Sequence, residues 1–241
     1  MKKHLYPLLA IGALLILATS CATLQVYDLQ CDGLTAPLAI DSESPHFSWK
    51  VLCDNPMTQE AYQIEVASSE SRLLAGEADL WQSGQVRSAE QVMVPYTGTT
   101  LSSRQQCWWR VRVWNQHGVS PWSSPQPFGI GILDQINGRY IGAAPGNSSL
   151  LRKKFTVADK FSQALLYVNS LGYHEVYLNG QKVSDNVLAP AVSQLSKHSL
   201  IVTYDVTALL KEGDNDLVLW TDAGWYRKHF NAVYDGAVVC A

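Results

Sequence analysis

A tight reversal of the chain constrains the fold more than any other feature. Residues 171–190 read LGYHEVYLNGQKVSDNVLAP, with alternating residue types on both sides of Asn179-Gly180. An Asn-Gly pair accepts the two positive φ angles of a type I′ turn, which joins antiparallel strands through a two-residue loop. The alternation divides the first strand into two faces, with Val176 and Leu178 on one and Glu175, Tyr177 and Asn179 on the other. We therefore predict a β-hairpin with one buried face.

A polar loop follows the predicted hairpin. It contains Ser184, Asp185 and Asn186, and it closes at Leu188-Ala189-Pro190. Loops held by a rigid scaffold carry a disproportionate share of binding residues. The loop is therefore a candidate site for a small ligand, and turn formation alone is the alternative role of its polar residues.

Short alternating runs also recur between residues 22 and about 130, separated by clusters of Gly, Pro, Ser and Asn. Several short strands with such punctuation predict an all-β sandwich. The expected strands are HFSWKVL (46–52), AYQIEVAS (61–68), QVMVPY (91–96) and CWWRVRVW (107–114).

The last of these runs has two different faces. Trp109, Val111 and Val113 alternate and should face the core. The opposite face interleaves aromatic and guanidinium groups, which can stack as a cation–π ladder. Its members are Trp108, Arg110, Arg112 and Trp114, with Trp122 as an extension. The ladder is either structural or a ligand-binding face.

Residues 131–149 are rich in Gly, Ala, Pro and Ser and predict a linker. Strands are expected again from residue 150 onwards, and Gly213-Asp214-Asn215 should break the chain between two of them. The run ALLYV suits a strand buried on both faces, and ALLKEG a short helical turn. The expected strands are LLRKKFTV (150–157), ALLYV (164–168), IVTYDVT (201–207), DLVLWTD (216–222) and the opening of another at AVVC (237–240).

The first twenty residues have the form of an export signal. Lys2 and Lys3 precede an apolar run, Leu8 to Leu17, that is shorter than the ~20 residues of a membrane span. The sequence LATSC that follows is similar to a bacterial lipobox. We expect a lipoprotein signal over residues 1–20, lipidation of Cys21, and a membrane partner through that lipid anchor. An ordinary cleaved signal peptide is the alternative. Either way we expect export, with the anchored form in the cell envelope, periplasmic or on the outer-membrane surface.

The charge and the remaining cysteines exclude some functions. A net charge of −3 gives no reason to expect a nucleic-acid partner. The cysteines have neither a C-x-x-C pair nor zinc-ligand spacing. An oxidising compartment permits a disulfide between Cys31 and Cys53. Buried free thiols are the alternative.

Several spaced motifs resemble bacterial α-L-rhamnosidases. The second half of the chain carries five motifs in the order of the N-terminal β-sandwich module of these enzymes. They are an E-x-Y-x-N-G hairpin, an acidic loop ending in L-x-P, YDVT, a G-x-N turn and GWY. The first half of the chain resembles the fibronectin-like domain that often precedes this module. The resemblance rests on the motifs F-S-W, Y-Q-I, W-x-S-G, W-R-V-x-V-W and W-S. The resemblance implies an all-β fold of two β-sandwich domains in tandem. These are a fibronectin type III/immunoglobulin-like domain at 22–130 and, after the linker, a jelly-roll-like carbohydrate-binding module at 150–241 that is truncated at its C-terminus.

The resemblance also bears on catalysis. Inverting glycosidases hold two carboxylates ~6.5–9.5 Å apart, and the resembled enzymes carry that pair in a helical barrel to which no residue here corresponds. Whether the chain is an enzyme therefore stays uncertain. We assign no catalytic residue and expect no hydrolysis by this chain alone. Five acidic residues of the first domain are expected to be solvated, namely Glu60, Glu65, Glu70, Glu77 and Glu90.

Sugar binding is the function that remains. Some modules of this type bind rhamnose, sometimes through calcium, whose preferred ligands are oxygens. The resemblance implies Asp185 and Asn186 as carbohydrate-binding residues and candidate calcium ligands. It adds Asp222 as a further polar contact and Trp225 as a stacking platform. The structural alternative for Asp222 is to cap the following turn, and that for Trp225 is to lie in the core.

Three functions follow from these features. The first is the exported accessory part of an α-L-rhamnosidase, with a rhamnose-containing glycan as partner. The second is an independent carbohydrate-binding or adhesion lipoprotein, and the third a purely structural fragment. The family's aspartate and aromatic after L-x-P are replaced by Gln194 and Leu195, so the sugar site departs from the family pattern there.

Overall fold

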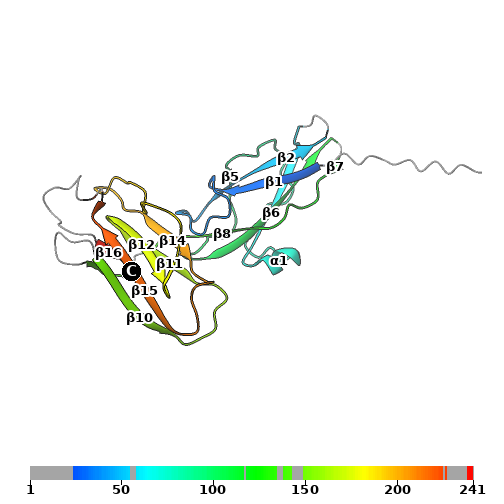
Figure 1. The fold of residues 1–241 in the computed structure, drawn as a ribbon. Helices are drawn as coiled ribbons and strands as arrows, with labels where there is room; N and C mark the ends of the chain where they lie inside the picture. Colours follow the sequence, from blue (N-terminus) through cyan, green and yellow to red (C-terminus); the bar gives the residue numbers. More distant parts are fainter. Residues whose placement is uncertain are drawn as a thin grey trace, which may run out of the picture.

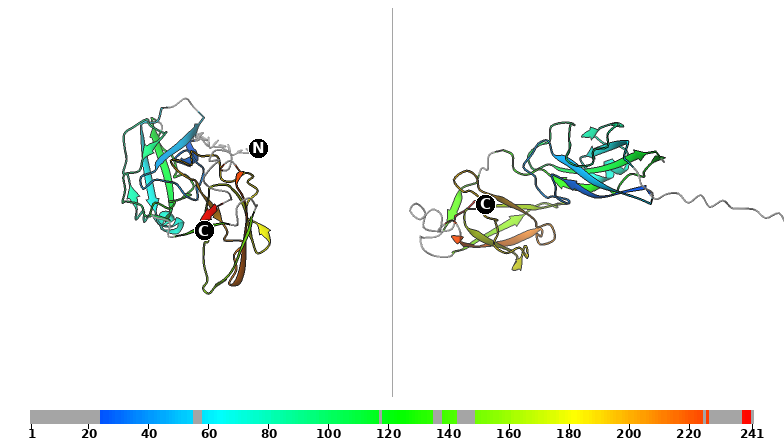
Figure 2. Two further views of the ribbon diagram at one scale, coloured as in Figure 1. Left: turned by 90° about the vertical axis from the view of Figure 1, so that its left-hand side faces the viewer. Right: turned by 90° about the horizontal axis from the view of Figure 1, so that it is seen from above.

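The computed structural model describes residues 24–54, 58–116, 118–134, 138–142, 149–224, 226 and 238–240. The predicted leader, Cys21 and Trp225 lie outside these residues. The described chain is almost entirely β-structure and forms two lobes (Figure 1). A view from above also separates the two lobes (Figure 2, right). The prediction of two β domains in tandem is confirmed.

The first lobe is a sandwich of two antiparallel sheets. Its strands are β1 (Leu24–Cys31), β2 (His46–Cys53), β3 (Ala61–Ala67), β4 (Trp81–Gln82), β5 (Val94–Pro95), β6 (Gln106–Asn115), β7 (Gly118–Val119) and β8 (Gln126–Gly129). One sheet has the order β1-β2-β5, and the other has β4-β3-β6-β7 with β8 also paired to β6. The strand predicted at 91–96 is much shorter than expected, because only Val94 and Pro95 are in β-structure.

Phe47 lies at the centre of this sandwich and is fully buried. Its ring stacks on Trp109 of the opposite sheet with 4.3 Å between centroids, and it meets Phe128 edge-on at 5.6 Å. Val111 and Val113 are buried beside them, as the alternation in β6 predicts. Aromatic pairs of this kind contribute ~0.5–1.5 kcal/mol each beyond the area they bury.

The outer face of β6 carries the predicted cation–π ladder. The guanidinium of Arg112 lies 5.0 Å from the ring centre of Trp114 and 4.5 Å from that of Trp122, and Arg110 lies 4.5 Å from Trp122. Arg110 is buried and donates from Nε and Nη2 to Oε2 of Glu65, at 2.9 and 2.6 Å. The expectation that Glu65 is solvated was therefore wrong, because its register partner on β6 is this arginine.

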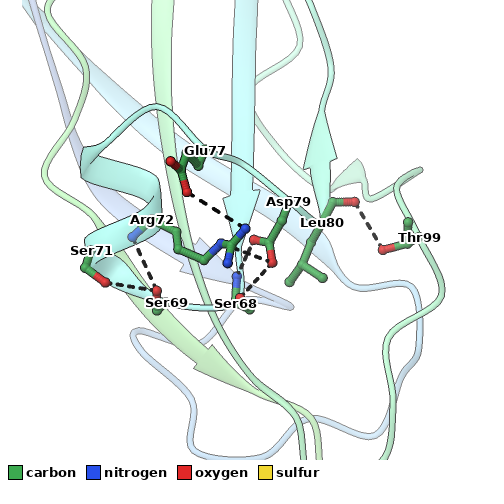
Figure 3. Close-up of polar contacts among 8 residues, drawn as sticks. All are labelled: Ser68, Ser69, Ser71, Arg72, Glu77, Asp79, Leu80 and Thr99. Carbon is green, nitrogen blue, oxygen red and sulfur yellow. Dashed lines mark hydrogen bonds and ion pairs between the residues drawn. The ribbon is translucent and has the colours of Figure 1, made fainter.

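A polar cluster stabilises the short helix α1 (Glu70–Leu74) between β3 and β4 (Figure 3). Ser69 caps the helix by accepting from the backbone N–H of Arg72, as N-cap residues do. Ser68 donates to Asp79 from its backbone and its hydroxyl, at 2.9 and 2.7 Å. The pKa of Asp79 is lowered overall, because these hydrogen bonds outweigh the effect of burial, which acts to raise that pKa.

Cys31, Cys53 and Cys107 are free. Cys31 lies opposite Phe47 and Cys53 opposite Leu24, at the two ends of the β1–β2 ladder. At ~3.3 Å per residue that separates the two thiols by roughly 20 Å, far beyond the reach of a disulfide. Both thiols are therefore free, but only Cys31 is buried as the alternative expects, and Cys53 is partly exposed. Burial raises the pKa of Cys107 to about 12 and that of Cys31 further still.

The second lobe is also a sandwich of two antiparallel sheets. Its strands are β9 (Tyr140–Gly142), β10 (Ser149–Val157), β11 (Leu165–Ser170), β12 (Tyr173–Leu178), β13 (Gln181–Lys182), β14 (Ile201–Asp205), β15 (Gly213–Asp222) and β16 (Val238–Cys240). One sheet has the order β10-β15-β12-β13 and the other β14-β11-β16-β9. The run AVVC is thus largely a strand, as predicted, and it pairs with β11 and β9 on its two sides.

The predicted hairpin forms as expected. Asn179 and Gly180 connect β12 to β13 with φ angles of 53° and 82°, which is the sign a type I′ turn requires at both positions. Val176 and Leu178 are buried, whereas Glu175 and Tyr177 lie on the outer face.

Three details of this lobe differ from the predictions. Gly213 does not break the chain but begins β15, with a φ of 83°. The ALLYV run forms a strand, yet Leu165, Leu166 and Tyr167 are only half-buried, so its first part is not buried on both faces. The residues 131–149 contain a strand, β9. Within the described residues no helix is long and apolar enough to cross a membrane.

Candidate functional site

His174 ties together the elements around the candidate site. Its backbone N–H donates to the carbonyl of Ala189 at 2.8 Å, and so it fixes the end of the loop that follows the hairpin. Its ring lies 2.6 Å from the Ser170 hydroxyl at Nδ1 and 2.8 Å from the Tyr204 hydroxyl at Nε2. Ser170 and Tyr204 belong to the opposite sheet, so one buried imidazole connects both layers. Burial lowers the pKa of His174 to about 4, and the ring is neutral near pH 7.

The loop after the hairpin is fixed at its ends and exposed at its apex. Ala189 and Pro190 are buried, whereas Asp185 and Asn186 are exposed. The backbone N–H of Asn186 donates to the hydroxyl of Ser184 at 3.1 Å, which is a local turn interaction. Both predicted calcium ligands therefore lie at the solvent-facing apex of the loop.

A first cavity, of about 510 Å³, lies beside this loop. We call it the loop cavity, and it is lined by Leu171–Tyr173 and Pro190–Ser196. Tyr173 contributes an aromatic ring, and Ser193 and Gln194 contribute hydrogen-bonding groups. The two residues that depart from the family pattern, Gln194 and Leu195, are thus part of the wall. The cavity can accept a ligand by stacking and neutral hydrogen bonds.

Gly172 explains how the loop cavity is built. A Cβ atom at this position would collide with the backbone carbonyl oxygen of Asp222. Only glycine therefore allows the chain between β11 and β12 to pass directly against the end of β15. This close approach brings Tyr173 next to Asp222, which is its register partner.

A second cavity, of about 460 Å³, lies on the outer face of the β10-β15-β12 sheet, and we call it the sheet groove. Tyr173 lines both cavities. The groove also contains the predicted residue Asp222, whose Oδ1 accepts from the backbone N–H of Gly224 at 3.1 Å. Its remaining lining residues are Leu150, His174, Glu175, Leu188, Trp220 and Thr221.

The structure separates the predicted site residues. Asp222 lines the sheet groove, whereas Asp185 and Asn186 line neither of the two cavities. Trp225 lies outside the described residues. The sequence analysis missed Trp220, although the alternation in DLVLWTD places it on the face opposite Leu217 and Leu219 and so marks it as an outward-facing aromatic.

Glu175 is the carboxylate of the sheet groove whose protonation the structure constrains. The described residues contain no group of three or more His, Cys, Asp or Glu side chains placed to hold a metal ion. Glu175 accepts from Lys182 Nζ and from the Tyr177 hydroxyl, each at 2.8 Å. These two hydrogen bonds lower the pKa of Glu175. A carboxyl group held ionised in this way is a poor general acid, because that role needs a raised pKa.

Both domains match known family models. Residues 26–134 match the Rha78A-like, N-terminal immunoglobulin domain, and residues 159–237 match the α-L-rhamnosidase N-terminal domain. Both domains therefore belong to the N-terminal domain families of α-L-rhamnosidases. The α-L-rhamnosidase of Formosa agariphila is 34% identical over 225 residues, and that of Alteromonas sp. is 35% identical over 213 residues.

Solved α-L-rhamnosidase structures show the same architecture. The enzyme from Dictyoglumus thermophilum superposes with a TM-score of 0.79 and 28% identity over 91% of this chain. The enzyme from Aspergillus terreus superposes with a TM-score of 0.77 and 26% identity over 90% of this chain. This chain covers 27% and 26% of those two chains. It spans about a quarter of the curated relatives as well, with 81% of this chain aligned to 24% of the Formosa protein.

Proposed function

We propose that this chain is the accessory, non-hydrolytic N-terminal region of an α-L-rhamnosidase and that it holds a rhamnose-containing glycan. The observation that carries the proposal is the alignment of both domains, in order, with proteins named α-L-rhamnosidase over 81% of the chain. The two cavities, which share Tyr173 as a lining residue, supply surfaces of the right size for one or two sugar rings.

The distribution of carboxylates supports the non-hydrolytic part of the proposal. Hydrolysis with inversion needs one protonated and one ionised carboxyl group facing each other across the bond. Glu175 and Asp222 lie on neighbouring strands of the sheet groove, but Glu175 is kept ionised by Lys182 and Tyr177. The buried Glu65 is paired with Arg110 in the first domain. Because its pKa is lowered, Glu175 is poorly suited to supply the proton that the leaving group requires.

The export part of the proposal rests on the leader sequence. We propose that Cys21 is lipidated and that the chain is anchored in the cell envelope, where polysaccharides are accessible to it. Labelling of growing cells with a palmitate analogue tests this directly. The wild-type chain should carry the label and a Cys21→Ser variant should not. A labelled variant or an unlabelled wild type would contradict lipidation.

Two assays test the sugar function. The purified chain should release no chromophore from p-nitrophenyl α-L-rhamnopyranoside above a protein-free blank. The same chain should migrate more slowly in a native gel containing a rhamnose-rich polysaccharide than in a plain gel. Release of the chromophore would contradict the non-hydrolytic role, and unchanged migration of folded protein would contradict glycan holding.

A further inference from the structure

Trp220 lies on a sheet face that also carries charged side chains. The outward-facing side chains of β15 include Asp214 and Asp216, which are engaged by neighbours on β10, Thr156 and Arg152. Trp220 lies on the same face and is 52% exposed. With the exposed Leu150 and Leu188, this aromatic ring forms an apolar patch, and such patches mark contact surfaces.

The indole of Trp220 is held in a defined orientation. Tyr177 on β12 lies beside it, with 5.6 Å between ring centroids and 41° between the ring planes. Across the sheet, the register places Glu175 on one side of Trp220 and Leu150 on the other. The ring therefore forms a preorganised platform.

Two leucines extend the apolar surface of the sheet groove. Leu150 and Leu188 line it, and each is 65% exposed. The backbone of Leu188 has a φ of 56°, a left-handed conformation that is strained for a leucine. Strained residues of this kind concentrate at ligand-binding sites. Leu188 thus combines a strained backbone with an exposed apolar side chain in the groove lining.

Fixed carboxylates lie beside the aromatic platform. Lys182 and Tyr177 hold Glu175, and the backbone N–H of Gly224 holds Asp222. An ionised carboxylate has about four acceptor positions. Lys182 and Tyr177 donate to Glu175, so Glu175 can accept further hydrogen bonds from a ligand. An aromatic face flanked by oriented acceptors suits a ring with an apolar C–H face and hydroxyl donors at its edge. A ligand carboxylate would meet like charge at Glu175 and Asp222, which disfavours acidic sugars.

We propose that the sheet groove binds a neutral pyranose residue of a glycan, with the apolar face of the sugar on Trp220 and its hydroxyls donating to Glu175 and Asp222. The inference rests on the proposed function and deepens it, because it assigns the stacking role to Trp220 and a sugar selectivity to the groove. With a volume of about 460 Å³, the groove has room for a ring together with part of its neighbour.

Saturation-transfer NMR with the full chain tests the proposal. The probes are methyl α-L-rhamnopyranoside as the neutral sugar and D-glucuronate as the acidic one. The wild type should saturate the rhamnoside and not the glucuronate, and Trp220→Ala should weaken rhamnoside binding at least about tenfold. Tyr27→Ala is the matched control, because Tyr27 is an exposed aromatic on a sheet of the first domain, and it should leave binding unchanged.

The outcomes separate this inference from the proposed function. If Trp220→Ala, shown to be folded by near-UV dichroism, binds the rhamnoside like the wild type, the groove proposal is wrong while glycan holding stands. If Trp220→Ala does not fold, Trp220→Leu takes its place, because it removes the aromatic face and keeps an apolar side chain, and unchanged binding by this variant refutes the proposal equally. If the folded wild type binds neither sugar, glycan holding and the groove proposal both fail. A wild type that ignores sugars but self-associates through Trp220 would make the groove a protein interface instead.

Discussion

Acidification should loosen the second domain through His174. The pKa of this ring is about 4 in the folded chain, because the ring is buried, and ~6.5 in an unfolded chain. As the pH falls below ~6.5, the unfolded state takes up the proton first, so the free energy of unfolding decreases. The full stability is therefore present above pH ~6.5 and is lost progressively as the pH falls toward 4.

The size of the effect follows from these two pKa values. Between pH 8 and pH 5 the linkage relation gives a loss of about 2 kcal/mol, or roughly a thirtyfold increase in the opening equilibrium. The surface carboxylates that have lowered pKa values, Glu175 and Asp216 among them, titrate mainly below this window. The loss between pH 8 and pH 5 is therefore assigned to His174.

Hydrogen exchange followed by mass spectrometry measures the effect in each domain separately. After correction for intrinsic exchange rates, peptides from β12 and β14 should lose about 2 kcal/mol of protection at pH 5, whereas peptides from β6 should lose much less. His174→Gln keeps a polar side chain at the position and should abolish the pH dependence in the second domain. An equal loss in the variant and the wild type would refute the role given to His174.

Three further substitutions test the packing. Arg110→Met leaves Glu65 buried without its partner and should cost about 3–5 kcal/mol in urea denaturation of the first domain; a cost below 1 kcal/mol would contradict a buried pair. Asn179→Ala removes a residue that holds φ at 53° and bonds to Leu209, Asn215 and Asp216. It should lower stability by about 2–4 kcal/mol, seen as a reduced melting temperature, and an unchanged one would speak against these contacts. Gly172→Ala should cost more than about 2 kcal/mol and raise exchange around the loop cavity, whereas a neutral effect would show that the chain there is not closely packed.

Local chemistry explains what could be predicted from the sequence. The hairpin was predictable because Asn179 and Gly180 alone determine a two-residue turn. The core face of β6 was predictable because Trp109, Val111 and Val113 alternate within one strand. These features depend on neighbours in the sequence, and the resemblance to α-L-rhamnosidases supplied their order.

Long-range pairing explains what could not be predicted. Glu65 is buried because the sheet register places it opposite Arg110, which is 45 residues away. The sheet groove exists because β10, β12, β15 and the loop ending at Ala189 meet at Trp220. No local pattern in the sequence reports such a meeting. Asp222, which the resemblance implied as a polar contact, lines the groove, whereas Asp185 and Asn186 lie at the apex of the loop; their roles in sugar binding stay predictions.

The most direct test of the central claim is a calorimetric titration of the folded chain with L-rhamnose, with calcium and again with a chelator. We predict a saturable heat of binding, which would establish the second domain as a sugar-holding module of an α-L-rhamnosidase. Heat that persists with the chelator would assign binding to the protein groups themselves, and heat lost with it would assign a role to calcium. Absence of heat under both conditions, from protein with intact near-UV dichroism, would contradict the account and leave these domains a structural role alone.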